Sequence, residues 1–229
     1  MAGICDFIFL IDGTGSMRPC LDALKSNIAA FIDELADNPQ TPVRDWRGRI
    51  ICYRDHKCDS DWWEPAPFVR TAEQLKQQLS SLAAHGGGDE PESLLDALYK
   101  VCSMEDERRG VQLSSGDKWR HRGDAVRVVV VFTDATYHPE MSIPEALGGT
   151  VDDIVHLAHN NRIILILYAP DHDCYDKLSR IDKSQWEPIE GPDFQKGLAD
   201  FTGNKEAFRK AMLALAKSIS KTVSVEVCA

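Results

Sequence analysis

The residues best suited to chemistry in this sequence follow an apolar run near its start. Residues 7–11 are all apolar, and Asp12, Thr14 and Ser16 come directly after them, separated by single glycines. A run of this length is typical of a strand buried on both faces, and the glycines let the chain turn sharply after it. One carboxylate and two hydroxyls on such a turn can point their oxygens at one spot, and Mg²⁺ or Mn²⁺ prefers oxygen ligands. The sequence therefore predicts a divalent-metal site at the end of this strand.

Three other kinds of site share parts of this pattern. A phosphatase of the haloacid dehalogenase type needs a nucleophilic aspartate two residues before Asp12, where this chain has Leu10. A phosphate-binding loop needs a lysine after its glycines, and here Gly15 is followed by Ser16 and Met17. A dinucleotide-binding fingerprint needs a third glycine. A metal site is the favoured interpretation, with an ordinary strand-to-helix turn as the main alternative and phosphate binding behind it.

Two further acidic segments lie where a metal site can use them. Residues 126–132 form the strongest predicted strand, and Asp134 follows them closely. A glycine-rich segment, residues 85–92, carries several acids, among them Asp89 and Glu92. Because the carboxyl ends of parallel strands share one edge of a sheet, we expect the two acids that follow the two strands to lie at the same edge.

Helices and strands alternate along the rest of the chain. Apolar stripes predict helices around residues 21–35, 75–82, 94–101, 151–158 and 208–219, and short apolar runs predict further strands at 49–53 and 163–168. A brief strand at Phe68 and Val69 is expected to close a hairpin, and residues 171–203 are expected to be mostly irregular. This alternation predicts an α/β fold with a doubly wound, mainly parallel sheet, helices on both faces and one short antiparallel edge strand.

Length and composition narrow the function classes. A chain of 229 residues with 43% apolar content suits one domain, residues 1–229. The formal net charge of −10 argues against nucleic acid or an anionic membrane as the main partner. No stretch approaches the about 18 apolar residues of a membrane span, and no basic region precedes an apolar one at the amino terminus. We therefore expect a cytoplasmic protein, in which the seven cysteines are reduced.

Taken together, three motifs resemble those of the von Willebrand factor A family, which includes the integrin I domains. Residues 12–16 match its metal-ion-dependent adhesion site, Asp-x-Ser-x-Ser, with a threonine in the middle. Residues 132–134 resemble the segment whose aspartate completes the coordination, and residues 87–92 resemble the integrin β-type loop whose glutamate faces the metal. The resemblance covers nearly the whole chain and implies a Rossmann-like fold. It implies a metal-ligand set of Asp12, Thr14, Ser16, Glu92 and Asp134, with Asp89 as the reserve for Glu92.

The resemblance implies a binding module, not an enzyme. A Mg²⁺ or Mn²⁺ held by few charged ligands accepts a carboxylate from a partner, so we expect a scaffold or adaptor that captures an Asp or Glu of another protein. Cytosolic relatives often act beside kinases, phosphatases or ATPases. Residues 53–56 also resemble a segment of many stand-alone intracellular members, and an ion pair between Arg54 and Asp55 that holds a hairpin is the simpler interpretation of it. A Mg²⁺-dependent phosphohydrolase that uses Asp12, and a structural subunit with an incidental metal, are the alternatives.

Three long segments are candidates for partner selection. Residues 55–67, 104–124 and 137–149 are expected on or near the face that carries the metal motifs. Trp62 and Trp63 lie in the first of these, where paired aromatics are typical of an interface anchor and equally of a brace for a hairpin. For residues 104–124 the simpler interpretation is a solvated connection.

Overall fold

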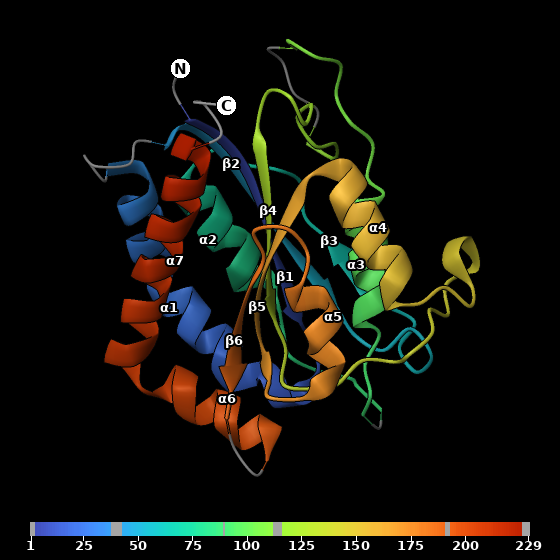
Figure 1. The fold of residues 1–229 in the computed structure, drawn as a ribbon. Coiled ribbons are helices and arrows are strands. Elements are labelled where there is room, and N and C mark those ends of the chain that lie inside the picture. Colours follow the sequence, from blue (N-terminus) through green and yellow to red (C-terminus); the bar gives the residue numbers. More distant parts are fainter. Residues whose placement is uncertain (1–2, 38–42, 89, 112–115, 191–192, 226–229) are drawn as a thin grey trace.

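A mostly parallel sheet forms the centre of the molecule (Figure 1). The computed structural model describes residues 3–37, 43–88, 90–111, 116–190 and 193–225. The strands are β1 (Gly3–Asp12), β2 (Val43–Tyr53), β3 (Trp63–Pro65), β4 (Val126–Phe132), β5 (Ile163–Pro170) and β6 (Gln185–Ile189). They lie in the order β3-β2-β1-β4-β5-β6, and every neighbouring pair is parallel except β2 and β3. The predicted mainly parallel sheet with one short antiparallel edge strand is confirmed.

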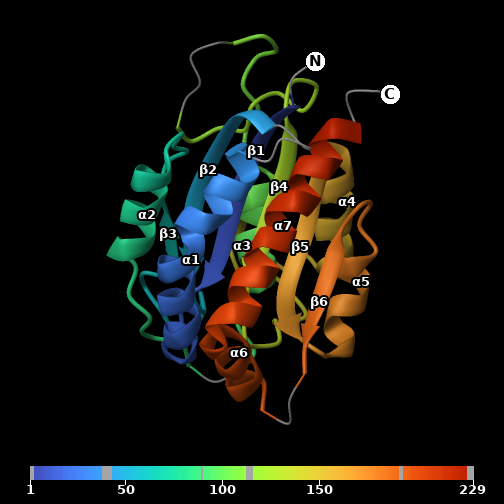
Figure 2. The ribbon, with the colours of Figure 1, turned by 90° about the vertical axis from the view of Figure 1, so that its left-hand side faces the viewer.

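Helices cover both faces of this sheet (Figures 1 and 2). One face carries α1 (Arg18–Asp37), α2 (Ala72–Ser81), α6 (Phe194–Gly203) and α7 (Lys205–Val225). The other face carries α3 (Leu94–Cys102), α4 (Val151–Asn161) and the single turn α5 (Asp176–Ser179). Three short 3-10 turns complete the described elements: η1 (Gly15–Met17), η2 (Pro144–Ala146) and η3 (Asp173–Tyr175). None of the described helices is long and apolar enough to cross a membrane.

The unbroken apolar run of β1 follows from its central place between two layers of helices. Phe7 and Phe9 belong to the core on the α1 and α7 side, whereas Ile8 and Leu10 belong to the core on the α3 and α4 side. All four side chains are fully buried. A strand buried on both faces cannot alternate apolar with polar residues, so the sequence pattern and the position of the strand agree.

Two predictions of secondary structure are wrong. The antiparallel partner of β2 is β3 and not a strand at Phe68 and Val69; Val69 forms only an isolated bridge with Gly48. Residues 171–203 are not mostly irregular, since they contain η3, α5, β6 and α6. The edge strand β6 is largely exposed and includes charged and polar residues, and therefore lacks the apolar run by which the central strands were predicted.

The segment between α3 and β4 lies at the amino end of the strands, opposite to its predicted place (Figure 1). The backbone N–H of Arg120 donates to Asp6 in β1 at 2.8 Å, and its Nε donates to the same carboxylate at 2.6 Å. Arg47 of β2 also pairs with Asp6, with its Nη2 at 2.5 Å from Oδ2. Trp119 is fully buried. The described part of residues 104–124 is therefore more than a solvated connection, because Trp119 and Arg120 are buried and join it to the amino end of the sheet.

Candidate metal centre

The carboxyl ends of β1 and β4 bring the predicted residues Asp12, Thr14, Ser16 and Asp134 together. These strands are neighbours, and the chain leaves them toward opposite faces of the sheet, which is the arrangement at which α/β folds bind ligands. The region between the two strand ends is called the crevice below. The Ser16 hydroxyl donates to Asp134 Oδ1 at 3.1 Å and lies 3.3 Å from the Thr14 hydroxyl. Four oxygen-bearing side chains from two strand ends therefore share one crevice.

Hydroxyl groups fix the carboxylate of Asp12 from two sides. Its Oδ1 accepts hydrogen bonds from the backbone N–H of Thr14 at 3.0 Å and from the Thr14 hydroxyl at 2.7 Å. Aspartate side chains often accept a hydrogen bond from the backbone N–H two residues further on, and this contact forms the turn after β1. Its Oδ2 accepts from the Thr133 hydroxyl at 2.8 Å. The side chain of Asp12 is fully buried and is held in one orientation.

Backbone pairing brings Glu92 into the same crevice. Its N–H donates to the carbonyl of Thr136 at 2.9 Å, and its carbonyl accepts from the N–H of His138 at 3.0 Å. This pairing ties the segment before α3 to the segment after β4. A Cβ added at Gly87 would lie 2.9 Å from the Cβ of Thr14 and 3.1 Å from Glu92 Oε1, so Gly87 separates these two side chains. The reserve candidate, Asp89, lies outside the described residues.

Burial raises the pKa of all three carboxyl groups in this crevice, and the charge of Asp12 raises the pKa of the other two further. Burial, followed by the charge of Asp12 and other acids, raises the pKa of Glu92 to about 8. Burial and Asp12 raise the pKa of Asp134 to about 7. Burial also raises the pKa of Asp12, although hydrogen bonds from Thr14 and Thr133 and the charge of Arg54 act in the opposite direction. Concentrated, poorly compensated negative charge is what a bound cation would neutralise.

Two oxygens in the crevice test whether these residues fit a metal. Within the part of the chain that is described, Glu92 Oε2 and Asp134 Oδ2 are buried and have no hydrogen-bond partner. A buried carboxylate oxygen without a partner is unfavourable, and a hard cation satisfies it directly. The donor set consists of carboxylates and hydroxyls alone, which suits Mg²⁺ or Mn²⁺ better than a soft metal. The residues therefore fit the predicted kind of ion.

Sequence reasoning did not assign two residues that shape this crevice. Thr133 orients Asp12, and its place directly after β4 was the only signal for such a role. Arg54 lies beneath the first turn, where its Cζ would be 3.4 Å from a Cβ added at Gly13. The predicted ion pair between Arg54 and Asp55 is wrong, because Arg54 pairs with Glu64. The hydroxyl of Ser93 and the ring of His138 contact Asp55 instead.

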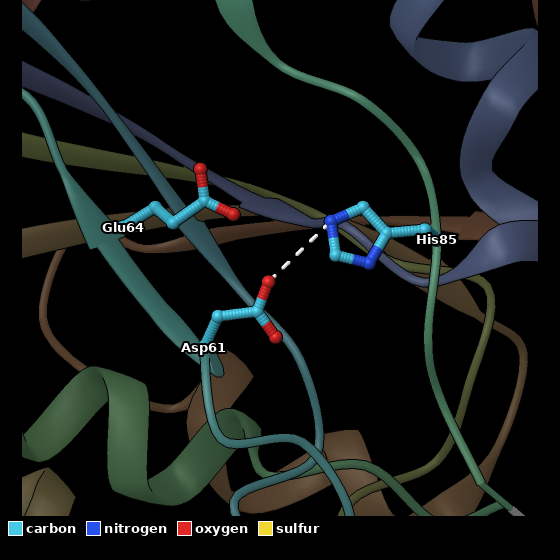
Figure 3. A group of neighbouring side chains, drawn as sticks. All are labelled: Asp61, Glu64 and His85. Carbon is cyan, nitrogen blue, oxygen red and sulfur yellow. Dashed lines mark ion pairs between the residues drawn. The ribbon is translucent and has the colours of Figure 1, made fainter.

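A second group of candidate ligands lies beside the β2–β3 hairpin. One ligand atom from each of Asp61, Glu64 and His85 lies within 4.8 Å of the others. His85 Nε2 is 3.5 Å from Asp61 Oδ2 (Figure 3). The guanidinium of Arg54 already lies against these acids, with Nη1 at 2.5 Å from Glu64 Oε1 and 3.9 Å from Asp61 Oδ2. A fixed positive charge this close opposes a divalent cation, so we favour the crevice between β1 and β4.

Trp62 and Trp63 pack against the molecule, half-buried. Their ring centroids are 5.6 Å apart, and the ring of His56 lies edge-on to Trp62 at 5.0 Å. The ammonium group of Lys100 lies 5.6 Å from the centroid of Trp62. Both tryptophans border the core on the α3 and α4 side. This packing matches the interpretation in which the tryptophans brace the β2–β3 hairpin.

Comparison with known proteins gives a family match and a similar protein. Residues 6–106 match the family model described as the von Willebrand factor A domain, a range that includes Asp12, Thr14, Ser16 and Glu92 and stops before Asp134. The α-protein kinase vwkA of Dictyostelium discoideum is 28% identical over 133 residues. That match covers 58% of this chain and 19% of the relative, so the chain spans about a fifth of the relative's length.

Solved structures of low sequence identity share the fold. A von Willebrand factor type A protein from Catenulispora acidiphila is 16% identical with a TM-score of 0.55, over 96% of this chain and 43% of that one. Proximal thread matrix protein 1 from the mussel byssus is 15% identical with a TM-score of 0.52, over 90% of this chain and 49% of that one. Residues 6–106 are thus similar to the von Willebrand factor A domain, and nearly the whole chain shares the fold of these solved structures.

Proposed function

We propose that residues 1–229 form a single metal-ion-dependent protein-binding domain, which captures an acidic residue of a partner protein. The proposed ligands of Mg²⁺ or Mn²⁺ are Asp12, Thr14, Ser16, Glu92 and Asp134. The observation that carries this proposal is the pair of buried carboxylate oxygens, one on Glu92 and one on Asp134, that have no hydrogen-bond partner among the described residues. Both belong to groups whose pKa is raised by burial and by the same neighbour, Asp12.

The chain's own residues prepare the site in two ways. Thr14 and Thr133 hold the carboxylate of Asp12 in a fixed orientation, which lowers the reorganisation needed on binding. Ser16 is only half-buried and marks the side of the crevice that opens to solvent. A divalent ion held there would supply an electrophilic position for a partner's carboxylate.

Selectivity is proposed to come from the loops that follow β2 and β4. Residues 55–62 and 133–143 both leave the sheet at its carboxyl edge, and a hydrogen bond of 2.9 Å between His56 Nδ1 and the Ser142 hydroxyl joins them. The resemblance to stand-alone intracellular members favours a cytoplasmic scaffold or adaptor. Similarity to a protein named as an α-protein kinase supports a kinase among the candidate partners, beside phosphatases and ATPases.

A magnesium titration tests the metal-binding part of the proposal. We expect the wild type to bind Mg²⁺ in isothermal titration calorimetry and Asp12→Asn to lose binding, because Asn keeps the shape of the side chain but not its charge. Asp22→Asn is the matched control, since Asp22 is exposed on α1. A wild type that binds neither Mg²⁺ nor Mn²⁺ would point to a structural subunit.

An affinity pull-down tests the partner. Wild type and Asp12→Asn are each incubated with native lysate, once with Mg²⁺ and once with EDTA, and retained proteins are identified by mass spectrometry. We expect a partner that is retained only by the wild type with Mg²⁺. Mg²⁺-dependent turnover of a generic phosphate ester that disappears in Asp12→Asn would instead establish the phosphohydrolase alternative.

A further inference from the structure

The fully buried side chain of Arg54 binds the segment that leads into the glycine-rich loop. Its Nε donates to the carbonyl of His85 at 3.1 Å, and its Nη2 donates to the carbonyl of Ala83 at 3.2 Å. Its Nη1 donates to the carbonyl of Asp61 at 2.9 Å and to Glu64 Oε1 at 2.5 Å. One guanidinium therefore fixes residues 83–85 to the β2–β3 hairpin.

A second contact from the same loop holds the glycine-rich segment two residues further on. Asp59 Oδ2 accepts a hydrogen bond from the N–H of Gly87 at 3.0 Å. A Cβ added at Gly88 would lie 2.7 Å from the Sγ of Cys58, so the backbone also packs closely there. Arg54 and Asp59 thus hold residues 83–88 from both ends.

The segment they hold forms one wall of the proposed metal site. The N–H of His85 donates to the carbonyl of Gly13 at 3.0 Å, and the N–H of Gly15 donates to the carbonyl of Gly86 at 3.3 Å. Gly87 has a φ of 78° and lies against both Thr14 and Glu92. Any drift of this segment therefore moves the backbone on which the first turn rests and the space between two proposed ligands.

Among the described residues, Arg54 makes its hydrogen bonds and ion pairs with the hairpin and with residues 83–85, although its charge also acts on Asp12. Its ion pairs are with Glu64 and Asp61, two acids whose side chains are partly exposed. Three further hydrogen bonds go to the backbone carbonyls of His85, Asp61 and Ala83. The arrangement is that of a residue that acts through the position of a loop.

We infer that Arg54 and Asp59 are positioning residues of the metal site: they hold residues 83–88 in the place that sets Thr14 and Glu92 for coordination. The inference rests on the proposed function. Residues that orient metal ligands without touching the metal typically change affinity by about 10- to 100-fold when removed. Arg54→Gln and Asp59→Ala should therefore weaken Mg²⁺ binding by about tenfold or more.

Matched variants separate position from charge. Arg54→Lys keeps the positive charge, but its single ammonium group cannot bind the acceptors that the planar guanidinium binds at once. It should therefore bind Mg²⁺ as weakly as Arg54→Gln does. Asp59→Asn removes the negative charge but keeps an oxygen for the Gly87 N–H, so it should bind nearly as well as the wild type. Arg70→Gln is the control for loss of an arginine, since Arg70 pairs with Asp45 at the other end of the sheet.

Two readouts are taken for each variant: the Mg²⁺ affinity by calorimetry and the amide hydrogen exchange of residues 83–88 without metal. We expect faster exchange and weaker binding together in Arg54→Gln and Asp59→Ala, at a thermal midpoint that shows the protein is folded. If Arg54→Gln does not fold, Asp59→Ala decides the matter, because Asp59 is half-buried on a loop.

Other outcomes distinguish the two proposals. Unchanged affinity in folded Arg54→Gln and Asp59→Ala, with a wild type that binds Mg²⁺, would overturn the inference and leave the proposed function in place. Equal losses in Asp59→Ala and Asp59→Asn would also overturn it, since charge alone would then explain the effect. A wild type that does not bind Mg²⁺ would overturn both.

Discussion

The Thr133 hydroxyl donates a 2.8 Å hydrogen bond to Oδ2 of Asp12, which joins the carboxyl ends of the neighbouring parallel strands β1 and β4. The other carboxylate oxygen of Asp12 is held by Thr14. Both oxygens of the central acid are thus oriented before any ligand arrives, and this contact can be tested alone.

Replacing Thr133 by valine should weaken Mg²⁺ binding about tenfold, because Asp12 loses one of the two groups that orient it. The free energy of unfolding should fall by about 1 kcal/mol, the usual effect of removing one buried hydrogen bond. Calorimetric titration and urea denaturation measure the two effects. Thr136→Val is the control, since no hydrogen bond of the Thr136 hydroxyl is among the described contacts. Equal affinities for Thr133→Val and the wild type would show that the contact does not prepare the site.

Glu92→Gln should stabilise the metal-free protein while weakening metal binding. Burial and neighbouring acids raise the pKa of Glu92 to about 8, so ionising this side chain in the folded protein is unfavourable. The neutral amide of Gln does not ionise and avoids this cost. At pH 8.5 we expect the free energy of unfolding to rise in Glu92→Gln, because the wild type must then bury an ionised carboxylate and the variant does not.

Asp89→Asn is the companion variant to Glu92→Gln. If Asp89→Asn weakens Mg²⁺ binding more than Glu92→Gln does, then Asp89 and not Glu92 is the ligand from the glycine-rich loop. Both variants are measured by calorimetry under the same conditions.

The metal-free protein should lose stability as the pH rises from about 5 to about 8. The folded-state pKa values of Glu92 and Asp134 are raised to about 8 and about 7, above ordinary values of 4.5 and 3.8. Between these limits the folded protein binds more protons than the unfolded chain, so the stability from these groups is present at low pH and is lost as pH rises. Thermal midpoints across this range measure the trend. Saturating Mg²⁺ should make the thermal midpoint depend less on pH. A thermal midpoint of the metal-free protein that rises between pH 6 and 8 would contradict the assigned environment of these acids.

Asp6→Asn should destabilise the protein by about 3–5 kcal/mol, because it leaves the buried guanidinium groups of Arg47 and Arg120 without their shared carboxylate. Mg²⁺ affinity should stay within twofold of the wild type, because Asp6 lies at the opposite end of the strands. Urea denaturation and calorimetry report the two quantities. A large loss of affinity in a folded Asp6→Asn protein would mean that the two ends of the sheet are coupled.

The pattern of apolar residues predicted the strands that are buried on both faces and the helices that bury one stripe of side chains. The central run of β1 and the stripe of α1 are examples, because burial there dictates residue type at every position. The meeting of Asp12 with Asp134 was also predictable, because parallel strands end at a common edge.

Features set by tertiary contacts were not predictable from pattern. The edge strand β6 is only partly covered, so its sequence carries little periodicity. Arg54 could have paired with any nearby acid, and only the path of the hairpin decides that the partner is Glu64 and not Asp55. The place of residues 104–124 depends on where α3 ends, which short-range sequence signals do not reveal.

The two ends of the sheet also differ in what can be attached to them. β1 begins and α7 ends on the side where Arg120 and Asp6 meet, away from the crevice between β1 and β4 (Figures 1 and 2). A linker joined at either of these points would leave from the end of the sheet that is opposite to its carboxyl edge. Tethering to a larger assembly through such a linker would thus leave the carboxyl edge accessible. It would also raise the effective concentration of this edge near acidic segments of the same assembly.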